Sequence, residues 1–138
     1  MRFLIIVKAT PESETETSPA SDEQLLAAMA GFHQELAKAG ALLDAAGLKP
    51  SSAGWRIRYH GQRREVVDGP FAEGQELIAG YTLIQARDCE EALAWSRRFP
   101  NPRGQGLAAE IEVRPLYAIE DFPPPAKLER FKALELPT

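Results

Sequence analysis

The stretch Phe3-Leu4-Ile5-Ile6-Val7 is apolar at odd and even positions alike. A strand with this pattern has both faces covered, as in the centre of a sheet that carries a layer on each side. The stretch is far shorter than the apolar part of a secretory signal, and no segment approaches the roughly 18 to 20 apolar residues that cross a bilayer. We therefore expect a central strand in a protein that does not enter a membrane.

Two helices are predicted after this strand. Ser21 and Gln24 have the spacing of a capping box, and a helix should run over about residues 22–39 until Gly40 ends it. Its apolar residues recur at helical spacing: Leu25, Met29, Phe32 and Leu36. Asp88 should cap the second helix, which ends before Pro100.

The remaining apolar segments predict strands. They cover residues 41–47, 55–59, 64–67, 77–86 and 110–116, and the second and third flank His60-Gly61 as in a hairpin. The order is the split βαβ pattern of a ferredoxin-like α+β domain with one inserted β-hairpin. Both helices should pack on one side of the sheet. We expect a homodimer, with two sheets packed face to face, to cover the other side.

Two segments lie outside this core. Residues 9–20 are rich in Thr, Ser, Glu and Pro and predict a mobile loop. Residues 1–120 should form the domain, and residues 121–138 a proline-led extension with helical spacing in its second half. That extension either docks on a partner subunit or frays, because isolated helices this short are marginal in water.

The amino-acid composition limits the classes of binding partner and cofactor that we expect. The 138 residues suit one domain, and 16 Lys and Arg against 20 Asp and Glu give a net charge of −4. This balance argues against a nucleic-acid or anionic-membrane partner. The single cysteine, Cys89, allows no internal disulfide and suits a reducing, cytoplasmic location. His33, His60 and Cys89 share no ligand spacing, so we expect neither metal nor cofactor.

Asp68-Gly69-Pro70-Phe71 places a carboxylate on a stiff turn beside an aromatic anchor. Pro70 fixes its own φ and restricts Gly69 before it. Asp68 could therefore keep one orientation in a pocket. The alternative is a tight turn with a solvated Asp68.

Other ionisable residues suggest further candidates. His33 lies beside the apolar stripe of the first helix and could carry a proton if Asp68 or Asp44 oriented it, or it could simply bind water. Glu110 and Glu112 alternate on the last strand and suggest an acid and base pair. Alternatively, Arg114 neutralises one of them in an ion network, and Lys8 could join that cluster or bind an anionic substrate.

The first hairpin strand alternates basic and apolar side chains. Arg56 and Arg58 should form its wet face, with the apolar residues opposite: Trp55, Ile57 and Tyr59.

Several stretches carry a family resemblance. They are Phe32-His33-Gln34-Glu35-Leu36-Ala37-Lys38-Ala39-Gly40, Gly47-Leu48-Lys49-Pro50-Ser51-Ser52, Asp68-Gly69-Pro70-Phe71-Ala72-Glu73, Asn101-Pro102 and Glu110-Ile111-Glu112-Val113-Arg114. With these the chain resembles the DGPF proteins, a branch of the YCII-related group. The resemblance implies a dimeric α+β barrel, related in fold to muconolactone isomerases and heme-free monooxygenases. The wider group uses a His and Asp pair, and its histidine position corresponds here to Met29, one turn before His33.

The resemblance leaves two functions open. The first is a cofactor-independent small-molecule enzyme with Asp68 and His33 as catalytic candidates, in a pocket near the dimer interface. The candidate pocket residues are Lys8, Asp44, Phe71, Glu73, Glu110 and Glu112. The second is a non-catalytic ligand-binding or regulatory dimer. It could associate with an extracytoplasmic-function sigma factor, because DGPF proteins are often encoded beside such factors.

Overall fold

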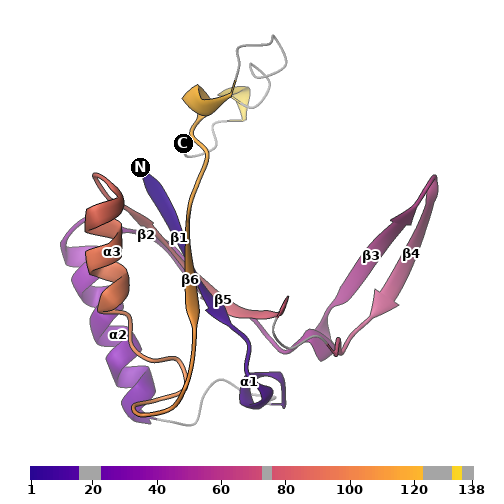
Figure 1. Ribbon diagram of the computed structural model, residues 1–138, viewed down its shortest axis with the longest axis horizontal. Coiled ribbons are helices and arrows are strands. Elements are labelled where there is room, and N and C mark those ends of the chain that lie inside the picture. Colours follow the sequence, from indigo (N-terminus) through magenta and orange to yellow (C-terminus); the bar gives the residue numbers. More distant parts are fainter. Residues whose placement is uncertain (16–22, 73–75, 123–131, 135–138) are drawn as a thin grey trace.

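The computed structural model describes residues 1–15, 23–72, 76–122 and 132–134. Its main sheet is antiparallel, with strand order β2-β5-β1-β6. The strands are β1 (Arg2–Lys8), β2 (Leu42–Gly47), β5 (Ile78–Gln85) and β6 (Ile111–Pro115). The long helices, α2 (Glu23–Lys38) and α3 (Cys89–Arg97), follow β1 and β5. The predicted ferredoxin-like α+β fold is confirmed (Figure 1).

The hydrophobic core lies between the two helices and one face of the main sheet (Figure 1). Phe3 and Ile5 of β1 are buried there, at 2% and 0% exposure, against Leu36 of α2. Helix α3 begins as expected, because the Asp88 side chain accepts a hydrogen bond of 2.9 Å from the Glu91 amide. The helices therefore cover the odd-numbered side chains of β1.

The opposite face of the main sheet carries the even-numbered side chains of β1. Leu4 stands opposite Leu83 and Arg114, and Ile6 stands opposite Tyr81 and Glu112. We call the surface formed by these six residues the bare face. Leu4, Ile6 and Leu83 stay only half-buried on it. The sequence correctly indicated apolar side chains on both sides of β1, and among the described residues only the helix side is covered.

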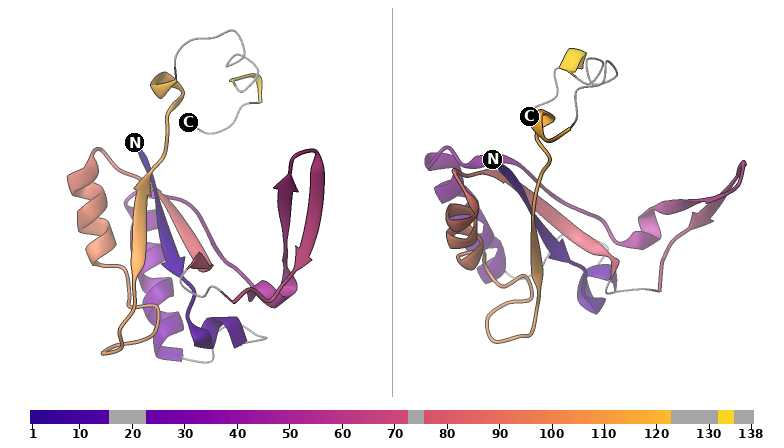
Figure 2. Two further views of the ribbon diagram at one scale, coloured as in Figure 1. Left: turned by 45° about the vertical axis from the view of Figure 1, so that its right-hand side comes forward. Right: turned by 45° about the horizontal axis from the view of Figure 1, so that its top comes forward.

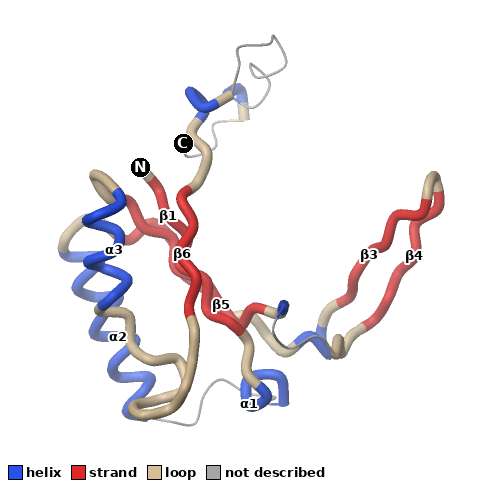
Figure 3. Tube along the Cα trace, viewed as in Figure 1, coloured by secondary structure: helices blue, strands red, loops and turns tan. Residues whose placement is uncertain are grey.

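The inserted hairpin forms a sheet of its own. Strands β3 (Trp55–His60) and β4 (Arg63–Asp68) pair antiparallel through a turn in which Gly61 has a φ of 61°. Figures 2 and 3 show the pair standing clear of the main sheet, on the side away from α2 and α3. We call residues 55–68 the arm.

The expectation for the two faces of the arm holds for Arg58, which is exposed, but the apolar side is exposed as well. The Arg56 guanidinium lies over the Phe71 ring, 4.0 Å from its centroid, so this face is held against the chain at the base of the arm. The opposite face points outward and is the more exposed of the two near the base. Its apolar residues are Trp55 (64% exposed), Ile57 (45%), Tyr59 (65%) and Val66 (63%).

The prediction of a loop at residues 9–20 needs correction, and the helix predicted in residues 121–138 cannot be compared with the structure. Part of the expected loop is a short helix, α1 (Pro11–Thr15), which Thr10 and Ser13 cap by exchanging backbone-to-hydroxyl hydrogen bonds of 2.8 and 3.1 Å. Pro11 suits the first helical position because its fixed φ matches the helix. The helix predicted in the extension falls almost wholly outside the described residues. None of the described helices is long and apolar enough to span a bilayer.

Candidate functional site

The Asp68-Gly69-Pro70-Phe71 turn ties the base of the arm to two other segments. The Phe71 amide donates to Ser51 Oγ at 3.0 Å, and Ser51 begins a short 3-10 helix, η1 (Ser51–Ala53). The Ser51 hydroxyl and amide in turn donate to the Glu14 carboxylate of α1, at 2.5 and 2.9 Å. We call Glu14, Ser51, Gly69 and Phe71 the joint, because they connect α1, η1 and the arm.

The glycine of the turn is required by its surroundings. A Cβ at Gly69 would overlap the Ser51 carbonyl oxygen and lie 2.7 Å from the Ser51 carbonyl carbon. The Gly69 amide donates to the Gly54 carbonyl at 3.0 Å, which brings the two backbones together. The Asp68 side chain is exposed at the end of β4, where the residue stands opposite Trp55. The turn thus has a structural reason for its glycine, while the catalytic role of Asp68 stays a prediction.

His33 lies on the other side of the main sheet. Its Nδ1 donates to the Met29 carbonyl oxygen at 2.7 Å, and its Nε2 is hydrogen-bonded to the Thr82 hydroxyl at 2.8 Å. Thr82 is only 2% exposed, so this contact is part of the core. Helix α2 and the arm lie on opposite sides of the sheet (Figure 1), and within one chain His33 and Asp68 are not brought together.

The bare face brings together residues that the sequence suggested separately. Lys8 Nζ lies 3.1 Å from Glu112 Oε1, and Arg114 Nη1 lies 3.1 Å from Glu112 Oε2. Hydrogen bonds from Arg114 and then from Lys8 lower the pKa of Glu112, so its carboxylate stays ionised at neutral pH. Glu110 lies one residue before β6 and is exposed. The ion network that the sequence offered as the alternative to a paired acid and base is the arrangement present.

A second ionisable pair lies toward the other edge of this face. The Tyr81 hydroxyl donates to Asp44 Oδ2 at 3.0 Å. This hydrogen bond raises the pKa of Tyr81, so the phenol remains a proton donor at neutral pH. Sequence reasoning had not singled out Tyr81. The signal was available, because odd positions of β5 share the face of Leu83, while Thr82 and Ile84 face the core.

Strand pairing in the main sheet fixes the distance between Tyr81 and the ion network at Glu112. Ile6 stands directly opposite Tyr81 on one side and Glu112 on the other. Neighbouring strands are about 4.8 Å apart, so the Cα atoms of Tyr81 and Glu112 are separated by roughly 10 Å. A proton donor and an ion network thus flank an apolar floor at a spacing that suits a small organic molecule.

The last predicted pocket residues are placed as follows. Phe71 belongs to the joint, and Glu73 lies outside the described residues. Across the described ranges, no cluster of three or more His, Cys, Asp or Glu side chains could hold a metal ion.

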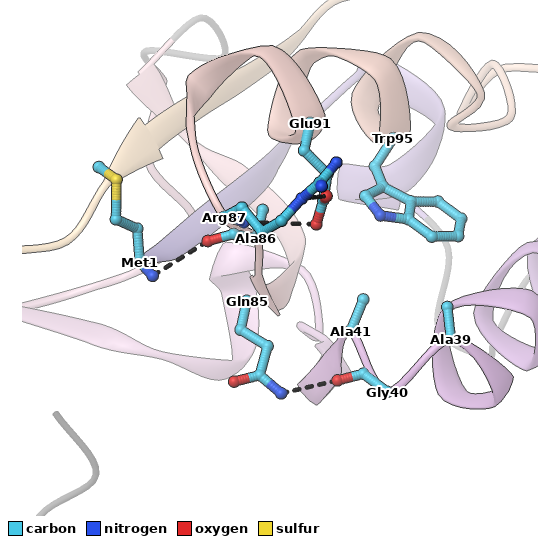
Figure 4. A pocket seen from close by; sticks show the side chains of 9 residues that line it. All are labelled: Met1, Ala39, Gly40, Ala41, Gln85, Ala86, Arg87, Glu91 and Trp95. Atoms are coloured by element: carbon cyan, nitrogen blue, oxygen red, sulfur yellow. Dashed lines mark hydrogen bonds and ion pairs between the residues drawn. The ribbon is translucent and has the colours of Figure 1, made fainter.

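A hollow of about 530 Å³ lies at the other end of the sheet, between the ends of α2 and β5 and the start of α3 (Figure 4). Its polar side chains are already paired. Gln85 donates to the Gly40 carbonyl at 2.7 Å, and Arg87 Nε lies 2.5 Å from Glu91 Oε2. None of the residues predicted for the pocket lines it, so we do not assign the site to this hollow.

Comparison with known proteins gives the family. Residues 1–117 match the YCII-related domain. The chain is also similar to a curated relative, "Uncharacterized protein R00369" of Rhizobium meliloti (strain 1021). The two are 32% identical over 99 residues, which cover 72% of this chain and 78% of the relative. The chain therefore belongs to the YCII-related family.

Proposed function

We propose that this protein is a homodimeric, cofactor-independent enzyme that binds a small organic molecule between the bare faces of two subunits. The observation that carries the proposal is the bare face itself. It combines an apolar floor, a protonated phenol and an ion network on one side of a sheet. Sites for small molecules are mostly apolar with a few convergent polar groups, which is the composition found here.

The roles of the polar groups follow from their charges. Tyr81 is held as a donor by Asp44, and it would donate a proton or a hydrogen bond to an oxygen of the ligand. Lys8 and Arg114 together outnumber the single carboxylate between them, so this edge would attract an anionic group of the ligand. The substrate class that fits is a small organic acid with a second oxygen about 10 Å or less from its carboxylate.

Charge also favours closure of the site by a second copy. Strands β2 and β6 are the two edges of the main sheet. A two-fold packing that sets the β2 edge of one subunit over the β6 edge of the other brings Asp44 toward Lys8 and Arg114 of the partner. We place this function in the cytoplasm, because the exposed Cys89 is a free thiol, as a reducing compartment keeps it.

The ligand proposal is tested with a library of small organic acids screened by thermal shift on the full chain. Hits are then titrated and checked for product by mass spectrometry. Tyr81→Phe should weaken binding or turnover of a hit at least tenfold. Tyr117→Phe should leave both unchanged, since Tyr117 lies beyond the end of β6, is 74% exposed and packs its ring against Phe122. If neither Tyr81→Phe nor Glu112→Gln changes the affinity or turnover of the hits, the proposed site is refuted. Binding without any product would make the protein a ligand-binding dimer instead.

The dimer proposal is tested by sedimentation. Ile6→Asp puts a charge in the centre of the bare face and should convert the dimer to monomer. Leu93→Asp is the matched control, because Leu93 is 53% exposed on α3, away from that face. Equal sedimentation of the two variants would contradict packing through the bare face.

A further inference from the structure

The outward face of the arm is an exposed apolar surface that the proposed function does not explain. Two aromatic side chains on it, Trp55 and Tyr59, are 64% and 65% exposed. Ile57 and Val66 stand directly opposite each other on β3 and β4, so the four apolar side chains share one face. Asp68 stands opposite Trp55 on that face, and the Arg64 guanidinium lies 5.0 Å from the centroid of the Tyr59 ring. Aromatic residues of this kind dominate the energetics of protein interfaces.

The described residues leave most of the arm uncovered. An isolated two-stranded hairpin is at best marginally stable in water and needs packing against something else. On the inward face, Arg56 lies over Phe71 at the base of the arm. Figures 2 and 3 show the rest of the arm projecting away from the main sheet. A surface of this shape is typical of an element that closes over another chain.

The charge of the arm indicates which protein chain the arm packs on. Residues 55–68 carry four arginines against one glutamate and one aspartate, so the arm has a net charge of +2, while the whole chain has −4. The rest of the chain therefore carries −6. On the Trp55 face itself Arg64 is balanced by Asp68, and the excess positive charge lies on the opposite face with Arg56. The charge of the arm therefore attracts another copy at long range, while the apolar patch makes the contact.

We propose that the arm of each subunit packs its Trp55 face on the body of the second copy in the dimer. The inference rests on the homodimer of the proposed function and adds the element that grips the partner. By two-fold symmetry both arms engage at once. Each patch exposes on the order of 400 Å², given 150–250 Å² for a buried aromatic side chain. Two arms and the surfaces under them would bury roughly 1,600 Å², the standard size of a stable interface.

The first test uses tryptophan fluorescence, because the chain has only two tryptophans, Trp55 and Trp95. The emission of Trp55 is obtained by subtracting the spectrum of Trp55→Phe, which reports Trp95 alone. Dilution of the full chain through its dimer dissociation constant should shift the Trp55 emission to the red and increase its quenching by acrylamide. Emission typical of exposed tryptophan at every concentration, in a protein that sedimentation shows to be dimeric, would overturn the inference.

The second test compares two faces of the same strands. Trp55→Ser with Tyr59→Ser removes the outward aromatics and should raise the dimer dissociation constant at least 30-fold, as expected for interface hot spots. Arg58→Ser with His60→Ser changes the opposite face of β3 and should raise it less than threefold. Similar dissociation constants for both double variants would refute a role for the Trp55 face.

The outcomes separate this inference from the proposed function. If Ile6→Asp dissociates the dimer while Trp55 stays exposed in the wild-type dimer, the arm does not grip the partner and the proposed packing of the sheets stands. If Trp55 is buried in a dimer that Ile6→Asp leaves intact, the arm inference stands and the face-to-face packing fails. A wild-type chain that is monomeric at about 100 µM would overturn both.

Discussion

Gly69→Ala places a methyl group where the backbone of another segment already lies. The new Cβ would overlap the Ser51 carbonyl oxygen and would stand 2.7 Å and 3.3 Å from Ser51 C and Ser52 N. All three are backbone atoms, so no side chain can rotate away to make room. Either η1 must separate from the turn, or the joint must open and release the hydrogen bond between Phe71 and Ser51.

The expected cost follows from this overlap. Forcing an extra methyl group into a close-packed contact typically costs about 1–3 kcal/mol. A 138-residue chain unfolds with an entropy of roughly 0.29 kcal/mol/K, so each 1 kcal/mol lowers Tm by about 3.5 °C. Gly69→Ala should therefore lower Tm by about 4–10 °C in calorimetry. Hydrogen exchange at the Phe71 amide should accelerate in the same protein, because that amide depends on the joint.

Gly54→Ala is the matched control. Gly54 adjoins η1 and meets the same Ser51 carbonyl oxygen, but the added Cβ would lie 3.8 Å away, an ordinary contact. Its backbone is extended, at φ −119°, which alanine adopts without strain. This variant should stay within about 0.5 kcal/mol of wild type or gain slightly. Equal stability of the two variants, with unchanged exchange at Phe71, would refute the close-approach explanation for the glycine.

Three further experiments, with four variants, test the core and the bare face. Leu36→Ala, at a position 0% exposed, should destabilise the chain by about 2–5 kcal/mol in urea unfolding, and a loss below 1 kcal/mol would contradict the packing described. In absorbance titration, Tyr81→Phe should remove a phenol that ionises above the usual tyrosine value of about 10, and Asp44→Asn should bring its pKa back down. Because the pKa of Glu112 is lowered in the fold, its ion pairs stabilise the protein above the ordinary glutamate range and are lost as pH falls below it. The stability difference between wild type and Glu112→Gln should therefore shrink between pH 6 and pH 3.

The sequence predicted the fold well because its signals were local. The periodicity of α2, the cap at Asp88 and the glycine at the hairpin tip each depend on residues a few positions apart. The short helix α1 was missed because five residues with one proline and polar side chains carry no apolar periodicity. Its capping by Thr10 and Ser13 is a pattern that residue spacing alone could have suggested.

The candidate site was harder to predict because it depends on pairings between distant segments. Lys8 could join the glutamate cluster or bind an anionic substrate by the sequence alone, and it contacts Glu112 because the two belong to neighbouring strands. Ser51 and Glu14 are 37 residues apart, and no local pattern connects them. The orientation of the arm was also inaccessible, because alternation gives two faces of a hairpin without saying which one turns toward the chain.

The joint and the arm are separable in a way that bears on how this chain can be altered. All contacts of the joint lie at the base of the arm, whereas Gly61 forms its tip at the far end. Side chains alternate along a strand with a period of two, so residues added to or removed from each strand in pairs keep the same face outward. The tip is therefore a natural place to lengthen the reach of the protein, or to insert a tag, while the attachment of the arm stays untouched.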